Sequence, residues 1–390
     1  MTETAQAEPT SGRLSPLHDV HAALGASFTD FAGWEMPVRY TSDLAEHHAV
    51  RTRSGLFDLS HMGEIVVVGP EAATALDYAL AGRLSAIALG QAKYTLLLAR
   101  DGGVIDDLVV YRTGEDRFMV VANAANREVV VDELLDRTAP FDVEVFDESD
   151  DVALIALQGP DALEVLLETP GFGIQGPGND HDDFASALRE LKYYRAVAAE
   201  YDGGPVLVAR TGYTGEDGFE LYVAPERAAD LWRAIAETGG PRVVPCGLAS
   251  RDTLRLEAGM PLYGHELGLD TQPVQAGLGR VVALAKEGDF VGRAGIEQGP
   301  RADAPVLVGL AAEGRRAARA GYAVLTGTGE DAAEIGVVTS GVLSPTLGHP
   351  IAMAFVHPDH AEPGTVLAVD VRGTRIPASV VALPFYRRGA

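Results

Sequence analysis

The sequence contains one cysteine, and it has no apolar stretch long enough to cross a membrane. Cys246 alone can form neither an internal disulfide nor a metal site built from several thiolates. A transmembrane helix needs about 18 or more consecutive apolar residues, and the polar, acidic residues 1–13 resemble neither a secretion signal nor a basic transit peptide. We therefore expect a cytoplasmic protein without disulfides, with a disordered lead-in over residues 1–15.

Positive charge is also scarce. The chain has 31 lysines and arginines against 56 aspartates and glutamates, which is a formal net charge of −25. This balance argues against nucleic acid and anionic membranes as partners. The lysines are Lys93, Lys192 and Lys286, so few side chains could anchor a Schiff base, and we expect no pyridoxal phosphate. Arginine, which binds carboxylates through a bidentate fork, must supply most of any anion recognition.

Motifs for metals and nucleotides are missing as well. The chain has ten histidines, but no HExxH and no Cys/His spacing typical of a zinc site, so we expect no metal. It has no GxGxxG after a predicted strand and no GxxxxGK[ST] loop, which excludes the common phosphate-cradling turns. Ser60 and His61 are neighbours on a predicted extended segment, where their side chains point apart, so they do not indicate a catalytic triad.

At 390 residues the chain is long for one hydrophobic core, and its pattern changes near residue 290. In the earlier part, apolar strands alternate with helical segments, which predicts an α+β architecture. The later part has short strands separated by glycine and proline, typical of a small β-barrel or sandwich. These strands are predicted over residues 306–311, 334–339, 351–356, 366–371 and 375–381. We expect two or three domains, with an α+β region over residues 16–285 and a C-terminal β domain over residues 290–388.

Two adjacent carboxylates occur within an apolar strand. Residues 102–112 read GGVIDDLVVYR, which is typical of a turn that leads into a strand. Side chains alternate along a strand, so Asp107 and Tyr111 share one face and Asp106 lies on the other. At least one carboxylate therefore faces protein, where it could accept a proton or anchor a polar ligand. The alternative is an edge strand or bulge with both carboxylates solvated, and residue chemistry alone leaves both interpretations open.

Three further segments carry residues that could meet a small polar ligand. Glu220 follows a glycine-rich turn that would let the backbone approach a ligand closely, although a hairpin with a solvated glutamate has the same composition. Arg251 and Arg255 are four apart on a predicted helix, where they could hold a carboxylate or form a salt-bridged surface. Asn123 follows another predicted strand. Residue chemistry thus predicts a polar site built from the aspartate pair, Asn123, Glu220 and Arg251, and leaves the reaction open.

Taken together, these segments resemble the glycine cleavage T-protein family, the tetrahydrofolate-dependent aminomethyltransferases. The resemblance covers about residues 17–386, and the motifs occur in the order of the family. They are DFAGWEMP (30–37), GLFDLSHMGE (55–64), GGVIDDL (102–108), LQGP (157–160), RTGYTGEDGFE (210–220), RDTLRLEAG (251–259) with LYG (262–264), and TSGVLSPTLG (339–348). Each motif alone is modest support, whereas all of them in register indicate the family.

The resemblance implies a three-domain cloverleaf, with two interleaved α+β domains around a folate channel and a C-terminal β-barrel or jelly-roll-like domain. It implies an enzyme that transfers the methylene of an aminomethyl group from the lipoyl arm of the H-protein to tetrahydrofolate. The products would be ammonia, 5,10-methylenetetrahydrofolate and the dihydrolipoyl H-protein. The expected partners are therefore tetrahydrofolate, as a co-substrate, and the lipoylated H-protein of the glycine cleavage system.

The family positions also imply roles for individual residues. Asp107 matches the catalytic carboxylate near N5 and N10 of the folate, and Asp106 is then its structural partner. Glu220 matches the residue that grips the pterin ring. All positions expected to contact folate or line its channel are Tyr94, Tyr111, Asn123, Glu220, Arg251, and, at the folate tail, Tyr386 or Arg387.

Two positions depart from the family pattern. Gln275 stands where the family usually has glutamate, and Arg280 where it usually has tryptophan, which bears on one local pocket contact. The nearest alternative function is another folate-dependent demethylase or methyltransferase of the same fold. A non-catalytic folate-binding factor for iron–sulfur assembly would carry a Lys-Gly-Cys-Tyr motif, whereas Cys246 lies in Val-Pro-Cys-Gly and is predicted to be structural.

Overall fold

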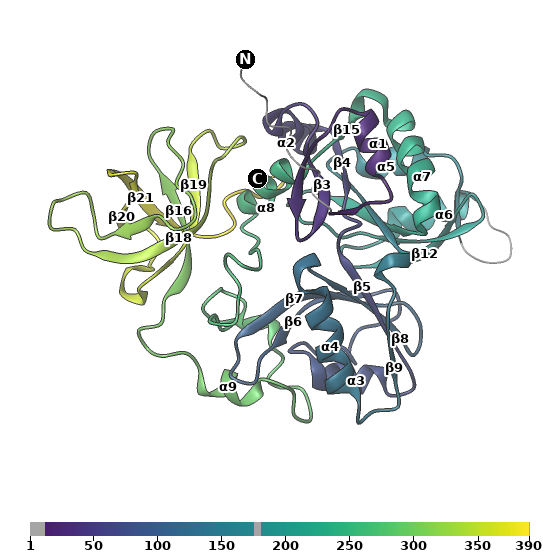
Figure 1. Cartoon of the computed structure of the whole chain (residues 1–390), viewed down its shortest axis with the longest axis horizontal. Helices are drawn as coiled ribbons and strands as arrows, with labels where there is room; N and C mark the ends of the chain where they lie inside the picture. The colour runs from purple at the N-terminus through teal and green to yellow at the C-terminus, as the bar shows by residue number, and fades with distance from the viewer. Residues whose placement is uncertain (1–11, 175–180, 390) are drawn as a thin grey trace, which may run out of the picture.

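The computed structural model describes residues 12–174 and 181–389, which form three lobes (Figure 1). Most of the predicted lead-in, residues 1–11, lies outside the described residues. The prediction is wrong for the last residues of the lead-in, because β1 (Arg13–Leu14) pairs in parallel with β3 (Trp34–Arg39) and Ser15 is buried. Pairing with an ordered strand makes this segment part of the fold.

The first lobe, at the upper right of Figure 1, contains a seven-stranded sheet with helices on one face. In spatial order its strands are β11 (Phe172–Ile174), β12 (Ala196–Tyr201), β13 (Gly204–Ala209), β14 (Gly218–Val223), β10 (Ala153–Gln158), β4 (Ser54–Asp58) and β15 (Val243–Pro245). The helices that share a core with this sheet are α1 (His18–Ala23), α5 (Ala162–Glu168), α6 (His181–Glu190) and α7 (Pro225–Gly239). The lobe also contains β2 (Ser27–Phe31), α2 (Asp43–Thr52) and α8 (Leu248–Glu257).

Helix α7 illustrates how local sequence produces these elements. Pro225 occupies its first turn, where the missing N–H has no intrahelical partner to lose, and Gly240, with a φ of 49°, follows its end. The apolar side chains that α7 buries recur at helical spacing and face the sheet. They are Ala228, Leu231, Trp232 and Ile235.

The second lobe is a five-stranded antiparallel sheet with helices on one face (Figure 1). Its strands in spatial order are β6 (Ala92–Leu98), β7 (Val104–Arg112), β8 (Arg117–Ala122), β5 (Gly63–Val68) and β9 (Glu144–Asp147), and its helices are α3 (Ala72–Ala79) and α4 (Arg127–Thr138). The opposite face carries Tyr111, Met119 and Val121. These side chains share a core with Leu154 and Ala156 of β10, so the two large sheets meet face to face.

The chain passes between these two lobes several times. Strands β4 and β5 are separated only by residues 59–62, yet they belong to different sheets. The chain returns to the first lobe at β10, and later contacts the second lobe again through Leu267, Val282 and Phe290. The predicted interleaving of two α+β lobes is therefore confirmed.

The third lobe is a closed six-stranded barrel (left in Figure 1). Its strands in spatial order are β16 (Val306–Ala312), β19 (Pro350–Val356), β18 (Glu334–Leu343), β17 (Ala323–Leu325), β20 (Val366–Val371) and β21 (Thr374–Val381). All five strands predicted from the sequence are confirmed, whereas β17 was missed because three residues show no periodicity. A further short helix, α9 (Arg293–Gln298), precedes the barrel, and α8 of the first lobe contacts β18 and β19.

Candidate active site

Asp107 and its neighbours lie on the face of the five-stranded sheet that meets the other sheet. Strand alternation along β7 places Asp107, Val109 and Tyr111 on this face, whereas Val110 faces the helices of the second lobe. Tyr94 of β6 is directly opposite Val109, so its side chain projects from the same face. The predicted separation of the two aspartates onto opposite faces agrees with this arrangement.

The Asp107 carboxylate is half-buried and accepts two side-chain hydrogen bonds. The Tyr94 hydroxyl donates to Oδ2 at 3.0 Å, and Asn123 Nδ2 donates to Oδ1 at 2.9 Å. Burial raises the pKa of Asp107, and these two hydrogen bonds oppose the shift because they favour the ionised form. A carboxylate that is oriented in this way and has a raised pKa is suited to accept a proton from a ligand.

Asp106 is fully buried and is bound by donors on both oxygens. Its Oδ1 accepts hydrogen bonds from Nδ2 of Asn123 and Nδ2 of Asn126, each at 2.7 Å, and its Oδ2 accepts the Asn123 backbone N–H at 3.0 Å. Burial, and next the charge of Asp107, raise the pKa of Asp106 to about 7, against the hydrogen bonds from the asparagines. The alternative of two solvated carboxylates is therefore wrong, and Asn123 bridges the pair.

The glycine pair before β7 is required by close packing of two backbones. Gly102 has a φ of 90°, and a Cβ on Gly103 would lie 1.9 Å from the carbonyl oxygen of Leu269. The N–H of Val104 donates to the carbonyl of Gly268 at 3.1 Å in the same segment. This contact fixes the start of β7 and therefore the position of the aspartates that follow.

Glu220 approaches from the opposite sheet. It precedes Tyr222 by two residues on β14, and Tyr222 belongs to the core between the sheets, so both side chains project toward the second lobe. Oε2 of Glu220 accepts the hydroxyl of Thr211, and the Tyr111 hydroxyl lies 3.5 Å from the same oxygen. Tyr111 is buried and bonds Thr211 at 2.9 Å, so its role in this structure is to hold the partners of Glu220.

The glycines of the turn before β14 make room for a protein side chain. A Cβ on Gly212 would lie 2.0 Å from Oε1 of Gln158, and one on Gly218 would lie 2.5 Å from its Nε2. Gln158 is buried, donates to the carbonyl of Thr211 at 3.0 Å, and accepts the Thr214 hydroxyl at 3.0 Å. The expected role of these glycines in approaching a ligand is therefore replaced by packing around Gln158.

Arg251 and Arg255 of α8 have different surroundings. The Arg251 guanidinium lies 5.0 Å from the ring of Tyr213, and its buried Nη1 has no hydrogen-bond partner among the described residues. Burial lowers the pKa of Arg251, and the charge of Glu220 offsets part of the shift. Arg255 instead forms a buried ion pair with Glu266 at 3.0 Å. Of these two arginines, Arg251 is therefore the one with a donor that no described residue occupies.

Comparisons with known proteins agree with this geometry. The family descriptions "GCVT N-terminal domain" and "Glycine cleavage T-protein C-terminal barrel domain" match residues 17–286 and 306–387. The chain belongs to the glycine cleavage T-protein family. An aminomethyltransferase from Cutibacterium acnes is 60% identical over 379 residues, which cover 97% of this chain and 100% of that relative. An aminomethyltransferase from Streptomyces coelicolor is 54% identical over 385 residues, which cover 97% and 99%.

A solved structure of the same family shows the same fold. The crystal structure of glycine cleavage system aminomethyltransferase T from Bartonella henselae matches with a TM-score of 0.85 at 36% identity, covering 96% of this chain and 98% of that chain. The predicted family, three-lobed fold and enzyme class are therefore confirmed. The relatives favour aminomethyl transfer over the alternatives of a demethylase or an iron–sulfur assembly factor.

The C-terminal segment of the chain, residues 384–388, lies against the end of α8. The backbone N–H of Tyr386 donates to the carbonyl of Glu257 at 2.8 Å, and the Tyr386 side chain is half-buried. The Arg387 side chain is exposed, while Arg388 forms an ion pair with Asp217 at 3.4 Å. The fold thus holds Tyr386 in place and leaves Arg387 pointing to solvent near the glycine-rich turn.

Of the two positions that depart from the family pattern, Gln275 has a structural role, and none is observed for Arg280. Gln275 is buried, donates to the carbonyl of Pro305 at 2.9 Å, and accepts the Gln272 N–H at 3.0 Å, so it closes a turn and ties it to the start of the barrel. Arg280 is exposed. Cys246 is buried, and burial raises the pKa of its thiol, which agrees with the predicted structural role.

Sequence reasoning missed Glu64, a buried carboxyl group on the Asp107 face. Glu64 of β5 is opposite Val121 of β8, which is opposite Val109 of β7, so all three project from one face. Both Glu64 oxygens are buried without a hydrogen-bond partner among the described residues. Burial raises the pKa of Glu64 well above its usual value, against the charge of Arg127. The signal in the sequence was a glutamate directly before the apolar run of residues 65–68, which indicates a carboxyl group that could be buried.

We expect Glu64→Gln to make the stability of the protein less sensitive to rising pH. The folded protein keeps the Glu64 proton, while the unfolded chain releases it near the usual pKa of 4.5. Stability is therefore lost as the pH rises from that value through the raised pKa of the folded protein, by up to about 1.4 kcal/mol per pH unit. Urea midpoints of the two proteins between about pH 5 and about pH 8 should diverge as pH rises. Parallel midpoints would show that Glu64 is hydrated or paired.

Other chemistries find little support in the described residues. Ser60 Oγ accepts the Leu154 N–H at 3.2 Å, and burial lowers the pKa of His61 to about 4, so the two do not form a nucleophile–base pair. Within residues 12–174 and 181–389, no group of three or more histidine, cysteine, aspartate or glutamate side chains is placed to hold a metal ion. No helix in the described part of the chain is long and apolar enough to span a bilayer.

Proposed function

We propose that the protein transfers the methylene of the aminomethyl group on the lipoyl arm of the H-protein to tetrahydrofolate, with Asp107 as the catalytic carboxylate. The observation that carries this proposal is the environment of Asp107, a half-buried carboxylate held by Tyr94 and Asn123. Glu220 and Arg251 belong to the opposite lobe, and Glu220 lies 3.5 Å from the Tyr111 hydroxyl of the second lobe, so both are proposed to bind the polar ring of the ligand.

The reaction exchanges protons and bonds at two nitrogens of tetrahydrofolate. The N–H bonds at N5 and N10 are replaced by two bonds to the methylene carbon, whose bonds to the amine nitrogen and to the lipoyl sulfur break. One released proton leaves with the amine as ammonia, and the other ends on the lipoyl thiol. Asp107 can accept each proton in turn, and its charge stabilises the cationic nitrogen that forms when N5 attacks.

The remaining residues are proposed to bind the folate. Glu220 would accept hydrogen bonds from the N–H groups of the pterin, and Arg251 would donate its unpartnered N–H to an acceptor of the ligand. Tyr386 and the exposed Arg387 would contact the negatively charged tail. The side chains that orient these groups, and that would line the folate channel, are Tyr94, Tyr111 and Asn123.

We infer the wider setting from the same family relationship. Tetrahydrofolate serves as a co-substrate, the lipoylated H-protein is the partner, and neither a metal nor pyridoxal phosphate takes part. Residues 16–285 form the folate-binding region and residues 290–388 the barrel domain. We also propose a cytoplasmic enzyme, and its net charge of −25 argues against nucleic acid and anionic membranes as partners.

The direct test incubates the protein with tetrahydrofolate and aminomethyl-loaded H-protein and measures ammonia. Release of ammonia that requires both substrates, together with formation of 5,10-methylenetetrahydrofolate, is the expected result. Omission of tetrahydrofolate is the matched control. Failure to release ammonia, with folate-dependent removal of a methyl group from a sulfonium or aryl ether donor, would overturn the proposal in favour of a demethylase.

We expect docking of the H-protein to be weak and tolerant of salt. H-proteins are acidic in this family, and this chain also carries a large negative charge, so long-range electrostatic attraction is missing. The KM for the H-protein should therefore change by less than about threefold between low and physiological ionic strength. A steep increase of this KM with salt would show that a local arginine patch dominates docking.

A further inference from the structure

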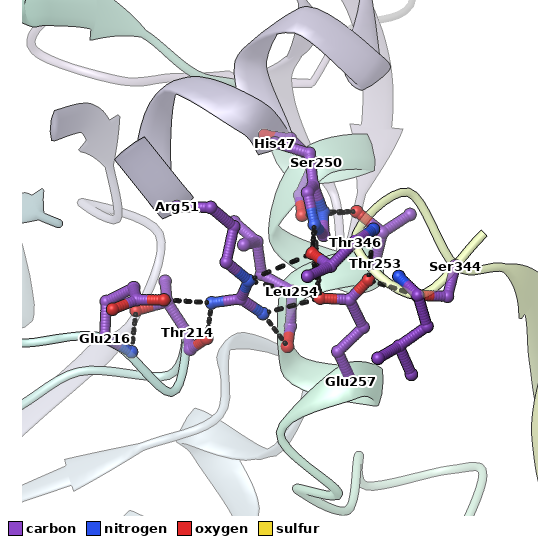
Figure 2. A network of polar contacts seen from close by, with 11 residues as sticks. His47, Arg51, Thr214, Glu216, Ser250, Thr253, Leu254, Glu257, Ser344 and Thr346 are labelled. Atoms are coloured by element: carbon purple, nitrogen blue, oxygen red, sulfur yellow. Dashed lines mark hydrogen bonds and ion pairs between the residues drawn. The ribbon is translucent and has the colours of Figure 1, made fainter. Parts of the chain in front are cut away.

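A buried polar cluster joins the barrel to the proposed folate site (Figure 2). Its centre is the Glu257 carboxylate at the end of α8, which is fully buried. Oε1 accepts the Thr346 N–H at 3.0 Å and the Ser344 hydroxyl, and Oε2 accepts the Thr346 hydroxyl at 2.7 Å. Ser344 and Thr346 lie in the loop between β18 and β19, so this carboxylate ties the barrel to α8.

Arg51 of α2 connects the same carboxylate to the glycine-rich turn before β14 (Figure 2). Nη2 donates to Glu257 Oε2 at 2.8 Å, whereas Nη1 donates to the carbonyl of Thr214 at 2.7 Å and to Glu216 Oε1 at 2.9 Å. The guanidinium also lies 4.0 Å from the centre of the Tyr386 ring. One side chain, only 4% exposed, therefore contacts α8, the turn and the C-terminal segment.

The demands on residue 51 fit arginine. The planar guanidinium presents five donors in a fork and can stack on an aromatic ring while doing so. Arg51 lies between the buried carboxylates of Glu216 and Glu257, each of which needs a nearby positive charge. His47 also contacts Glu257 at 3.2 Å, but burial lowers the pKa of His47, so Arg51 supplies the permanent charge.

The turn that Arg51 holds also carries residues that contact Glu220 and Arg251, the side chains proposed to bind folate. Thr211 donates to Glu220, and the ring of Tyr213 lies against the Arg251 guanidinium. Thr211 and Tyr213 lie within three residues of Thr214, whose carbonyl binds Arg51 together with the Glu216 carboxylate. A shift of the turn would therefore displace the supports of the binding residues without removing any group that touches the ligand.

We propose that Arg51 is a positioning residue that couples tetrahydrofolate binding to the seating of the C-terminal barrel. This inference rests on the proposed function, because it assigns the turn and Tyr386 to a folate site. Arg51 holds both in the arrangement that binds the ligand, and Glu257 fixes the barrel loop to the same guanidinium. Asp107 belongs to the second lobe, so loss of Arg51 should affect ligand binding more than the chemical step.

The test substitutes Arg51→Lys, which keeps the charge but cannot reach both carboxylates and stack on Tyr386. The KM for tetrahydrofolate should rise at least about tenfold, the size expected for one lost charge-assisted hydrogen bond. The kcat should stay within about threefold of the wild-type value. The matched control is Arg53→Lys, because the Arg53 side chain is exposed and donates to the carbonyl of Pro241, away from the turn and the barrel. The KM of this variant for tetrahydrofolate should remain unchanged.

Hydrogen exchange on the full-length protein distinguishes positioning from a merely structural role. In Arg51→Lys, amides of residues 211–218 and 344–348 should both exchange faster, and bound 5-methyltetrahydrofolate should slow both segments in the wild type. Glu216→Gln, which weakens the same link from the other side, should also raise the KM for tetrahydrofolate and provides a second variant if Arg51→Lys does not fold.

Two outcomes would overturn the inference. If the wild type releases ammonia but Arg51→Lys and Glu216→Gln keep a wild-type KM for tetrahydrofolate, Arg51 has no positioning role and the proposed function stands. If the wild type neither binds tetrahydrofolate nor releases ammonia, the proposed function fails and this inference fails with it.

Discussion

An Asp107→Asn variant should fold and bind tetrahydrofolate but lose most of its turnover. Asparagine has nearly the same shape and can still accept the hydrogen bond from Tyr94, but it can neither accept a proton nor stabilise a cationic nitrogen. We expect kcat for ammonia release to fall about 100-fold or more, the range for loss of a general base. The KM for tetrahydrofolate should change little, because Glu220 and Arg251 remain in place.

Asp106→Asn is the matched control for this experiment. Asp106 is buried and bridged to Asp107 through Asn123, so its removal should reduce kcat by a smaller factor. Asp106→Asn should also change the pH dependence of turnover near neutrality, because the pKa of Asp106 is raised to about 7. A larger loss in Asp106→Asn than in Asp107→Asn would show that the catalytic carboxylate was assigned to the wrong face of β7.

Arg255→Ala should destabilise the protein by about 3–5 kcal/mol, because it leaves the buried Glu266 carboxylate without its ion-pair partner. Arg255 also donates to the Ser340 hydroxyl at 2.7 Å, so the substitution breaks a link between α8 and the barrel. The expected result is a lower urea midpoint for the barrel and first lobe. Unfolding would be followed by circular dichroism and by tryptophan fluorescence, which reports on the first lobe because Trp232 lies in its core.

Arg251→Gln provides the contrast for that result. Arg251 and Arg255 are four residues apart on one helix, yet Arg251 Nη1 has no hydrogen-bond partner among the described residues. Arg251→Gln should therefore keep a urea midpoint close to the wild type and raise the KM for tetrahydrofolate instead. Equal losses of stability in the two variants would show that Arg251 has a structural partner.

The aspartate pair shows how far residue chemistry reached. Alternation along a strand separated Asp106 from Asp107, and the family register selected Asp107, whose contacts with Tyr94 and Asn123 now support that choice. The environment of Asp106 could not be predicted. Its three hydrogen bonds come from residues 17 and 20 positions away in the sequence, at the end of a neighbouring strand.

The arginine pair and the glycine-rich turn show where local patterns were insufficient. The spacing of Arg251 and Arg255 predicts one shared helical face, but it does not reveal that Glu266 neutralises only one of them. The glycines of the turn suggested a ligand, whereas the space they leave is filled by Gln158 from another strand. In both examples the deciding side chain lies outside the local pattern: Glu266 follows Arg255 by 11 residues, beyond the end of α8, and Gln158 precedes the turn by more than 50.

The glycine pair, the strand alternation around Asp107 and the short strands after residue 306 follow from the sequence, because backbone sterics and side-chain periodicity act over a few residues. The sequence does not predict that the two large sheets pack against each other, because β4 and β5 are close in sequence but belong to different sheets. The positions of Glu64 and Arg51 depend on that packing as well. Distant segments supply the partners of the buried Arg51 guanidinium, whereas Glu64 has none among the described residues and keeps its proton; only the tertiary structure decides both environments.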